Sequence, residues 1–133
     1  MRRPLTFLTL EQVLSIHERM IEEFGGIPGI RDHGLLQSAV MIPAAKFGGT
    51  MLHNDLPSMA AAYLFHLCKN HAFVDGNKRT ALAASEMILL MNGNRLSAPD
   101  DVIYELTISV ADGTASKKDV TASFHHHVTE DSD

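Results

Sequence analysis

Residues 71–80 (HAFVDGNKRT), near the middle of the chain, carry groups suited to acid–base and phosphate chemistry. Histidine is a common general base in enzymes, so the imidazole of His71 could take a proton from an attacking hydroxyl. The carboxylate of Asp75 is an oxygen ligand of the kind that Mg²⁺ binds in proteins. We therefore expect His71 to be the general base and Asp75 to hold a metal ion.

The turn at residues 76–79 is expected to open a helix whose first amides attract an anion. Gly76 allows the sharp turn that brings the backbone close to a ligand. Lys78 and Arg79 oppose the helix dipole, which favours negative side chains at this end, unless a phosphate lies between them. We predict that phosphate is bound by Gly76, Asn77, Lys78 and Arg79, and that Lys78 also offsets charge that develops during the reaction.

The alternative interpretation of the segment is an ordinary helix–loop–helix corner with solvated charges. That alternative explains least well why two cations stand at a helix N-terminus. Phe73 is expected to anchor the loop in the core.

The segment resembles the signature of the Fic/Doc superfamily, in the form typical of its Doc (death-on-curing) branch. The resemblance covers most of residues 5–112. It includes further positions outside the motif: Phe24-Gly25-Gly26, Gly29, Arg31-Asp32, Gly34-Leu35-Leu36, Phe47-Gly48-Gly49 and Asn70.

The chain departs from the wider Fic pattern, His-Pro-Phe-x-x-Gly-Asn-Gly-Arg-x-x-Arg, at three positions. Ala72 replaces the proline, Lys78 replaces the second glycine, and Leu82 replaces the final arginine. Fic proteins mostly transfer a nucleotide monophosphate to a hydroxyl. The Doc branch shares these departures and is associated with transfer of the terminal phosphate of ATP.

The resemblance therefore implies a toxin of a toxin–antitoxin module that transfers phosphate from ATP, with Mg²⁺, to a protein hydroxyl. It implies elongation factor Tu as the substrate, a block of translation, and a Phd-type antitoxin as the restraining partner. Lys69 is a weaker candidate for a further cation at the site. The Glu-Gly or Glu-Asn pair of the Fic inhibitory helix is absent from the sequence, so self-inhibition by that device is not expected.

Two other functions remain open. One is AMP transfer of the Fic type, against which the absence of arginine at position 82 speaks. The other is a catalytically silent protein that only binds an antitoxin, against which His71, Asp75, Asn77 and Arg79 speak.

Composition indicates one folded domain over residues 1–133, with 45% apolar and 20% charged residues. The formal net charge of −5 argues against direct nucleic-acid binding. The apolar runs are too short to cross a bilayer, so a cytoplasmic protein without membrane contact is expected. The single cysteine, Cys68, excludes an intrachain disulfide and is expected to be buried.

Helical periodicity and capping signals predict an all-α fold of six helices. The resemblance implies that they form a compact bundle of the Fic/Doc type, with the active loop between two central helices. Capping signals are seen at Thr9 with Gln12, Asp32, Asp55, Ser97 with Asp100, and Ser116 with Asp119. No segment shows sustained alternation, so no sheet is expected. Residues 128–133 are expected to form a disordered acidic tail.

The histidines outside the motif are expected to be structural. His17 is interpreted as a partly exposed helical residue, because a second histidine at position 21 is missing from the zinc pattern that His17-Glu18 could begin. His66 is expected to lie in the core or behind the site. His125, His126 and His127 are adjacent and cannot share one helix face, so a structural metal site is not expected there.

Overall fold

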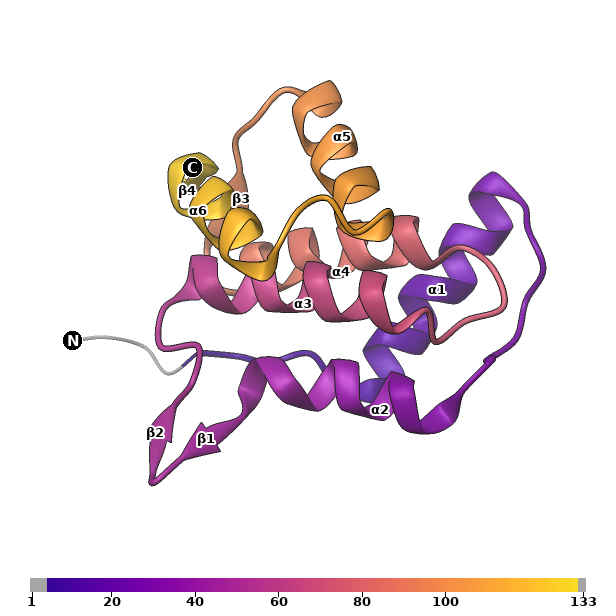
Figure 1. Cartoon of the computed structure of the whole chain (residues 1–133), viewed down its shortest axis with the longest axis horizontal. Helices are drawn as coiled ribbons and strands as arrows, with labels where there is room; N and C mark the ends of the chain where they lie inside the picture. Colours follow the sequence, from indigo (N-terminus) through magenta and orange to yellow (C-terminus); the bar gives the residue numbers. More distant parts are fainter. Residues whose placement is uncertain (1–4, 132–133) are drawn as a thin grey trace.

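The structure is a computed structural model that describes residues 5–131, and six α-helices dominate these residues (Figure 1). The all-α prediction is therefore confirmed. In chain order the helices are α1 (Leu10–Phe24), α2 (His33–Met41), α3 (Leu56–Asn70), α4 (Asn77–Met91), α5 (Asp100–Ala111) and α6 (Lys117–His127). A short 3₁₀ helix, η1 (Ile42–Ala44), follows α2.

Four of the five predicted capping signals form as expected. Thr9 and Ser116 build capping boxes with Gln12 and Asp119, and Asp32 and Asp55 accept from backbone amides in the first turns of α2 and α3. The signal at Ser97 and Asp100 is wrong. Pro99 precedes α5 without a side-chain cap, because its fixed φ already suits the start of a helix.

Helix α3 is the centre of the core and packs against α2, α4, α5 and α6, while α1 packs against α4 (Figure 1). Small residues let α3 and α4 approach closely: Ala60, Ala61, Ala81 and Ala84 are all completely buried. The two helices therefore hold the loop that joins them between rigid supports.

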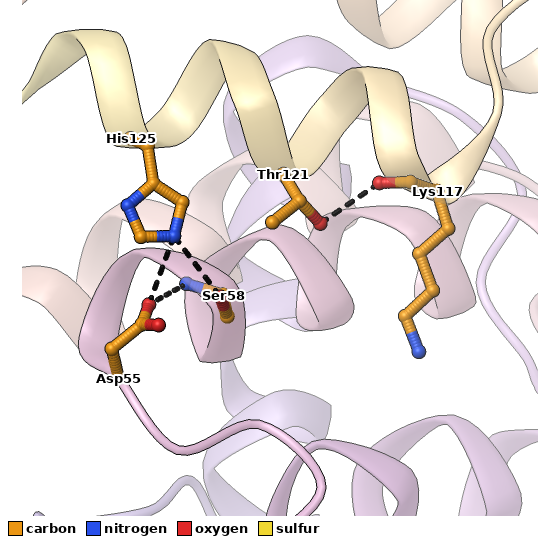
Figure 2. A network of polar contacts seen from close by, with 5 residues as sticks. All are labelled: Asp55, Ser58, Lys117, Thr121 and His125. Atoms are coloured by element: carbon orange, nitrogen blue, oxygen red, sulfur yellow. Dashed lines mark hydrogen bonds and ion pairs between the residues drawn. The ribbon is translucent and has the colours of Figure 1, made fainter.

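Polar contacts fasten α6 to the beginning of α3 (Figure 2). His125 points down from α6, with its Nε2 atom 3.2 Å from Asp55 Oδ1 and 3.2 Å from Ser58 Oγ. The same Asp55 oxygen accepts from the Ser58 amide at 2.8 Å, which caps α3. Thr121 donates to the Lys117 carbonyl within α6 at 2.8 Å. His125 thus has a packing role at this helix junction.

The expectation of no sheet is wrong, because two small antiparallel pairs form. Strands β1 (Lys46–Phe47) and β2 (Thr50–Met51) make a hairpin that projects from the helices (Figure 1). Gly48 and Gly49 turn it with φ values of 58° and 83°. Strands this short leave no alternating pattern in the sequence.

The second pair also corrects the predicted disordered tail. Strand β4 (Val128–Glu130) pairs with β3 (Asn94–Leu96), so residues 128–130 are ordered against the segment that follows α4. Residues 132–133 lie outside the described part of the chain. None of the helices between residues 5 and 131 combines the length and apolar composition needed to cross a membrane.

Candidate active site

The predicted active loop joins the C-terminal end of α3 to the N-terminal end of α4, between the two central helices. His71 follows α3 directly and adopts the left-handed conformation, with φ 48° and ψ 49°. It is the only non-glycine residue with positive φ among residues 5–131. This conformation ends α3 and turns the chain into the loop, and the His71 side chain is exposed.

The loop between α1 and α2 is paired with the active loop along its length. Ile30 and Phe73 form an antiparallel bridge. The Ala72 carbonyl accepts from the amides of Arg31 and Asp32 at 2.7 and 3.0 Å. The Val74 amide donates to the carbonyl of Gly29 at 3.0 Å. The active loop is therefore fixed by a second, distant segment of the sequence.

The side chain of Asn77, one of the residues predicted to bind phosphate, is engaged within the loop itself. Its side chain is 7% exposed, and its Oδ1 atom accepts from the Phe73 amide at 2.9 Å. Its Nδ2 atom donates to the Phe73 carbonyl, also at 2.9 Å. The Asn77 side chain therefore holds the loop, and its backbone N–H makes no hydrogen bond within residues 5–131 and is available for a phosphate.

The Asp75 carboxylate is exposed and hydrogen-bonded by two backbone amides. Its Oδ2 atom accepts from Ile27 N at 3.1 Å, and its Oδ1 atom accepts from Gly76 N at 2.9 Å. These two bonds, first that from Ile27 and then that from Gly76, lower the pKa of Asp75, and the charges of Lys78 and Arg79 act in the same direction. Asp75 is therefore ionised at neutral pH, as metal binding requires.

The same geometry engages the backbone N–H of Gly76, another residue predicted to bind phosphate. Its N–H is taken by Asp75, so that amide is not available to a phosphate. Gly76 instead supplies the backbone turn, with φ 77°. The N–H groups of Asn77, Lys78 and Arg79 belong to the first turn of α4 and make no hydrogen bond with any other residue in the range 5–131.

A pocket of about 350 Å³ lies over this turn and gathers most of the predicted site residues. His71, Asp75 and Lys78 all line it, and Lys69 does so as well. The remaining lining residues are Cys68, Val74, Gly76, Asn77 and Ala111. A base, a carboxylate and two ammonium groups therefore face one space.

Arg79 lies apart from this pocket. Its guanidinium carbon is 4.2 Å from the centre of the Phe24 ring, a cation–π contact. Phe24 is the last residue of α1 and is 55% exposed. Arg79 thus contacts the C-terminal end of α1 and does not line the pocket.

His17 is the clearest error of the sequence-based interpretation. Instead of being partly exposed, it is 6% exposed, and its ring stacks on Phe73 with centroids 3.7 Å apart and planes 6° apart. Its Nε2 atom lies 2.8 Å from the carbonyl oxygen of Asp75. The available signal was its place four residues after the buried Val13, on the core-facing stripe of α1.

Cys68 is buried, as predicted, and burial raises the pKa of its thiol. Its Sγ atom lies 3.7 Å from the Thr107 carbonyl oxygen. A buried thiol that stays protonated is a poor nucleophile, so Cys68 forms a wall of the pocket.

The donor set fits a magnesium–nucleotide complex. Within residues 5–131 no group of three or more His, Cys, Asp or Glu side chains could hold a metal ion by itself. Mg²⁺ that accompanies a nucleotide usually binds one or two carboxylates together with phosphate oxygens and water. Asp75 with the neighbouring first-turn amides of α4 meets that requirement, and Lys69 and Lys78 supply positive charge for the phosphates.

Comparison with known proteins agrees with the resemblance of the motif. The sequence profile described as the Fic/DOC family matches residues 7–89. The chain is 49% identical over 79 residues to "Toxin Doc" of Mycolicibacterium smegmatis (strain ATCC 700084 / mc(2)155), a match that covers 59% of this chain and 61% of that relative. It is 31% identical over 111 residues to "Protein kinase doc" of Escherichia phage P1, covering 83% of this chain and 86% of that protein.

Proposed function

The chain belongs to the Fic/DOC family, and on that premise we propose that it transfers the terminal phosphate of ATP to a hydroxyl group of a protein. The observation that carries this proposal is that His71, Asp75 and Lys78 line one pocket at the start of α4. A base, a metal-binding carboxylate and a cation are the groups that phosphoryl transfer needs.

In this mechanism the first turn of α4 binds the phosphates through the N–H groups of residues 77–79, helped by the helix dipole. Lys78 and Lys69 neutralise phosphate oxygens. Asp75 would hold Mg²⁺, whose charge would offset that of the phosphates. His71 accepts the proton of the acceptor hydroxyl. The hydroxyl oxygen forms a bond to the terminal phosphorus, the bond from that phosphorus to the bridging oxygen breaks, and ADP leaves.

Positioning accounts for most of the rate enhancement in such reactions, and several contacts hold the residues of the active loop in fixed positions. Asn77 bridges both polar backbone groups of Phe73, and the α1–α2 loop pairs with Ala72 and Phe73. The left-handed turn at His71 puts its imidazole on the pocket side of the α3 terminus.

By its relatives, the protein acts as the toxin of a toxin–antitoxin module. One relative is named a toxin and another a protein kinase. We further propose elongation factor Tu as the acceptor protein, a block of translation as the consequence, and a Phd-type antitoxin as the partner that restrains it in the cytoplasm.

AMP transfer is the second candidate, favoured by membership of the wider family. Lys78 occupies the position where the Fic pattern has a glycine, and Leu82 the position of its last arginine. The lysine beside the phosphates and the absence of the phosphate-binding arginine favour transfer of phosphate over transfer of AMP.

The test is incubation of the purified protein with Mg²⁺, cell extract and ATP, labelled in parallel reactions on the terminal phosphate or on the adenine. Labelling of a protein from the terminal phosphate alone supports phosphoryl transfer. Labelling from adenine, or an AMP adduct in the intact mass, supports AMP transfer instead. The variant His71→Ala should abolish labelling, and undiminished labelling would exclude His71 as the base.

A further inference from the structure

His17 is a buried polar residue that the mechanism above does not use. It projects from α1 toward the active loop, and it contacts that loop at two points. Its ring stacks on the fully buried Phe73, and its Nε2 atom lies 2.8 Å from the Asp75 carbonyl oxygen. A carbonyl oxygen can only accept a hydrogen bond, so Nε2 must carry the proton.

This bond completes a set that fixes the peptide unit between Asp75 and Gly76 on both sides. The carbonyl of the unit accepts from His17, and its N–H donates to the Asp75 side chain at 2.9 Å. Because a peptide unit is planar, the orientation of the carbonyl also sets the direction of the N–H. The His17 bond therefore bears on where the Asp75 carboxylate points.

The contact leaves little room for adjustment. A Cβ atom added to Gly76 would lie 3.6 Å from the Cδ2 and Nε2 atoms of His17 and 3.2 Å from the Cδ1 atom of Ile21. The backbone at Gly76 therefore lies directly against α1. The stacking on Phe73 also fixes the plane of the imidazole, and with it the direction of the Nε2–H bond.

We propose that His17 is a positioning residue for the transfer reaction, which holds the Asp75–Gly76 peptide, and through it the Asp75 carboxylate, in the orientation that magnesium–ATP binding needs. This inference rests on the proposed function. His17 does not line the pocket, so it acts through Asp75 and not on the reacting atoms. Groups that orient a metal-binding side chain in this way typically change metal affinity or activity by about 10–100-fold when removed.

Three variants separate positioning from simple packing. His17→Phe keeps an aromatic ring against Phe73 but removes the donor. His17→Gln keeps a side-chain N–H. Val13→Ala is the matched control, because Val13 is completely buried one helical turn earlier on α1, and its truncation destabilises the helix without touching the loop.

The first readout is the transfer rate over a range of Mg²⁺–ATP concentrations, with thermal unfolding of each variant. We expect His17→Phe to raise the Mg²⁺–ATP concentration needed for half-maximal rate by about tenfold or more. His17→Gln should recover most of that loss, and Val13→Ala should leave the rate of the folded protein unchanged. A wild-type rate profile in His17→Phe, or an equal loss in Val13→Ala, would overturn the positioning role.

The second readout does not depend on transfer. Nitrogen NMR of labelled histidine should show Nε2 of His17 protonated, and an Nδ1–H tautomer would overturn the inference. Carbon NMR of the Asp75 carboxyl should show a higher pKa in His17→Phe than in wild type, because the bonds from Ile27 and Gly76 loosen.

If the wild-type enzyme transfers phosphate to no protein in the labelling assay, the proposed function fails. The Asp75 titration then decides the role of His17, and an unchanged pKa refutes it.

Discussion

The side chain of Arg31 caps the end of α3: its Nε atom donates to the backbone carbonyl of His71 at 2.7 Å. Its Nη2 atom donates to the carbonyl of Asn70 at 3.2 Å. The last carbonyls of a helix lack partners within it, so such contacts stabilise its end. Because His71 is also the expected base, the same two bonds fix the backbone from which the imidazole projects.

Replacement of Arg31 should therefore affect both stability and transfer. We expect Arg31→Ala to reduce the free energy of unfolding by about 1 kcal/mol, since it removes hydrogen bonds at an exposed site. Transfer should fall as well, because His71 loses its support. In Arg31→Lys the charge stays, but a single ammonium cannot reproduce the planar donor pair, so only part of both losses should be recovered.

Urea denaturation and the labelling assay measure these effects. Arg19→Ala is the control, because Arg19 is an exposed cation on α1 that does not line the active pocket. A fully active Arg31→Ala protein would show that His71 needs no such support.

Local signals in the sequence were enough to predict most of the helices. The boxes at Thr9 and Ser116 and the caps at Asp32 and Asp55 depend on residues within three positions of one another, so they can be read directly. The motif is local in the same way. His71, Asp75 and Lys78 are close in sequence, and in the structure they line one pocket.

Contacts between distant segments could not be predicted. The bond from His17 to Asp75 spans 58 positions, and that from Ile27 to Asp75 spans 48. The loop contacts of Asn77 were not foreseen for a different reason. An amide can bind phosphate or backbone groups, and only the folded loop shows that the side-chain oxygen and nitrogen of Asn77 both bond to Phe73.

A glycine at position 71 should separate stability from activity. His71 has positive φ, a conformation that costs a side-chain-bearing residue about 1 kcal/mol relative to glycine. We expect His71→Gly to unfold at a higher temperature than His71→Ala and at least as high as wild type. It should also lose transfer by about 100-fold or more, because the base is gone. Calorimetry and the labelling assay test this, and a destabilised His71→Gly protein would refute the assumed strain.

The pKa of Asp75 gives a pH-dependent prediction. Because the Ile27 and Gly76 amides lower it, the carboxylate should remain charged at pH values where an ordinary aspartate, with a pKa of about 3.9, begins to take up protons. A lowered folded-state pKa means that the contribution of Asp75 to stability is present above its unfolded pKa. That contribution is lost as the pH falls through the folded value.

Calorimetric titration with ATP should show Mg²⁺-dependent binding. The part of the binding free energy that depends on Asp75 should be unchanged between pH 7 and about pH 5. The variant Asp75→Asn keeps oxygen and shape but lacks the charge, so it should lose the Mg²⁺ dependence and retain the weaker binding seen without metal. Equal Mg²⁺ dependence in both proteins would exclude Asp75 as the metal ligand.

His66, which lies on α3 and does not line the active pocket, should make the fold sensitive to acid. Its Nε2 atom is buried with no hydrogen-bond partner among residues 5–131. Burial first, then the charge of Lys117 on α6 (Figure 2) and that of His53, lower the pKa of His66 from 6.5 to about 4. In the folded protein His66 is therefore neutral over a pH range in which the unfolded chain binds a proton.

Stability from this group is thus fully present above pH 6.5 and is lost as the pH falls toward about 4. Since His66 is only half-buried, solvent screening reduces the effect, and we expect a loss on the order of 1–2 kcal/mol. His66→Phe removes the titration with similar volume, so its stability should fall less over this range, as measured by urea denaturation at several pH values. His126→Gln, an exposed control, should follow wild type. Parallel curves for wild type and His66→Phe would show that another group causes the acid sensitivity; His53 is the next candidate, because burial also lowers its pKa.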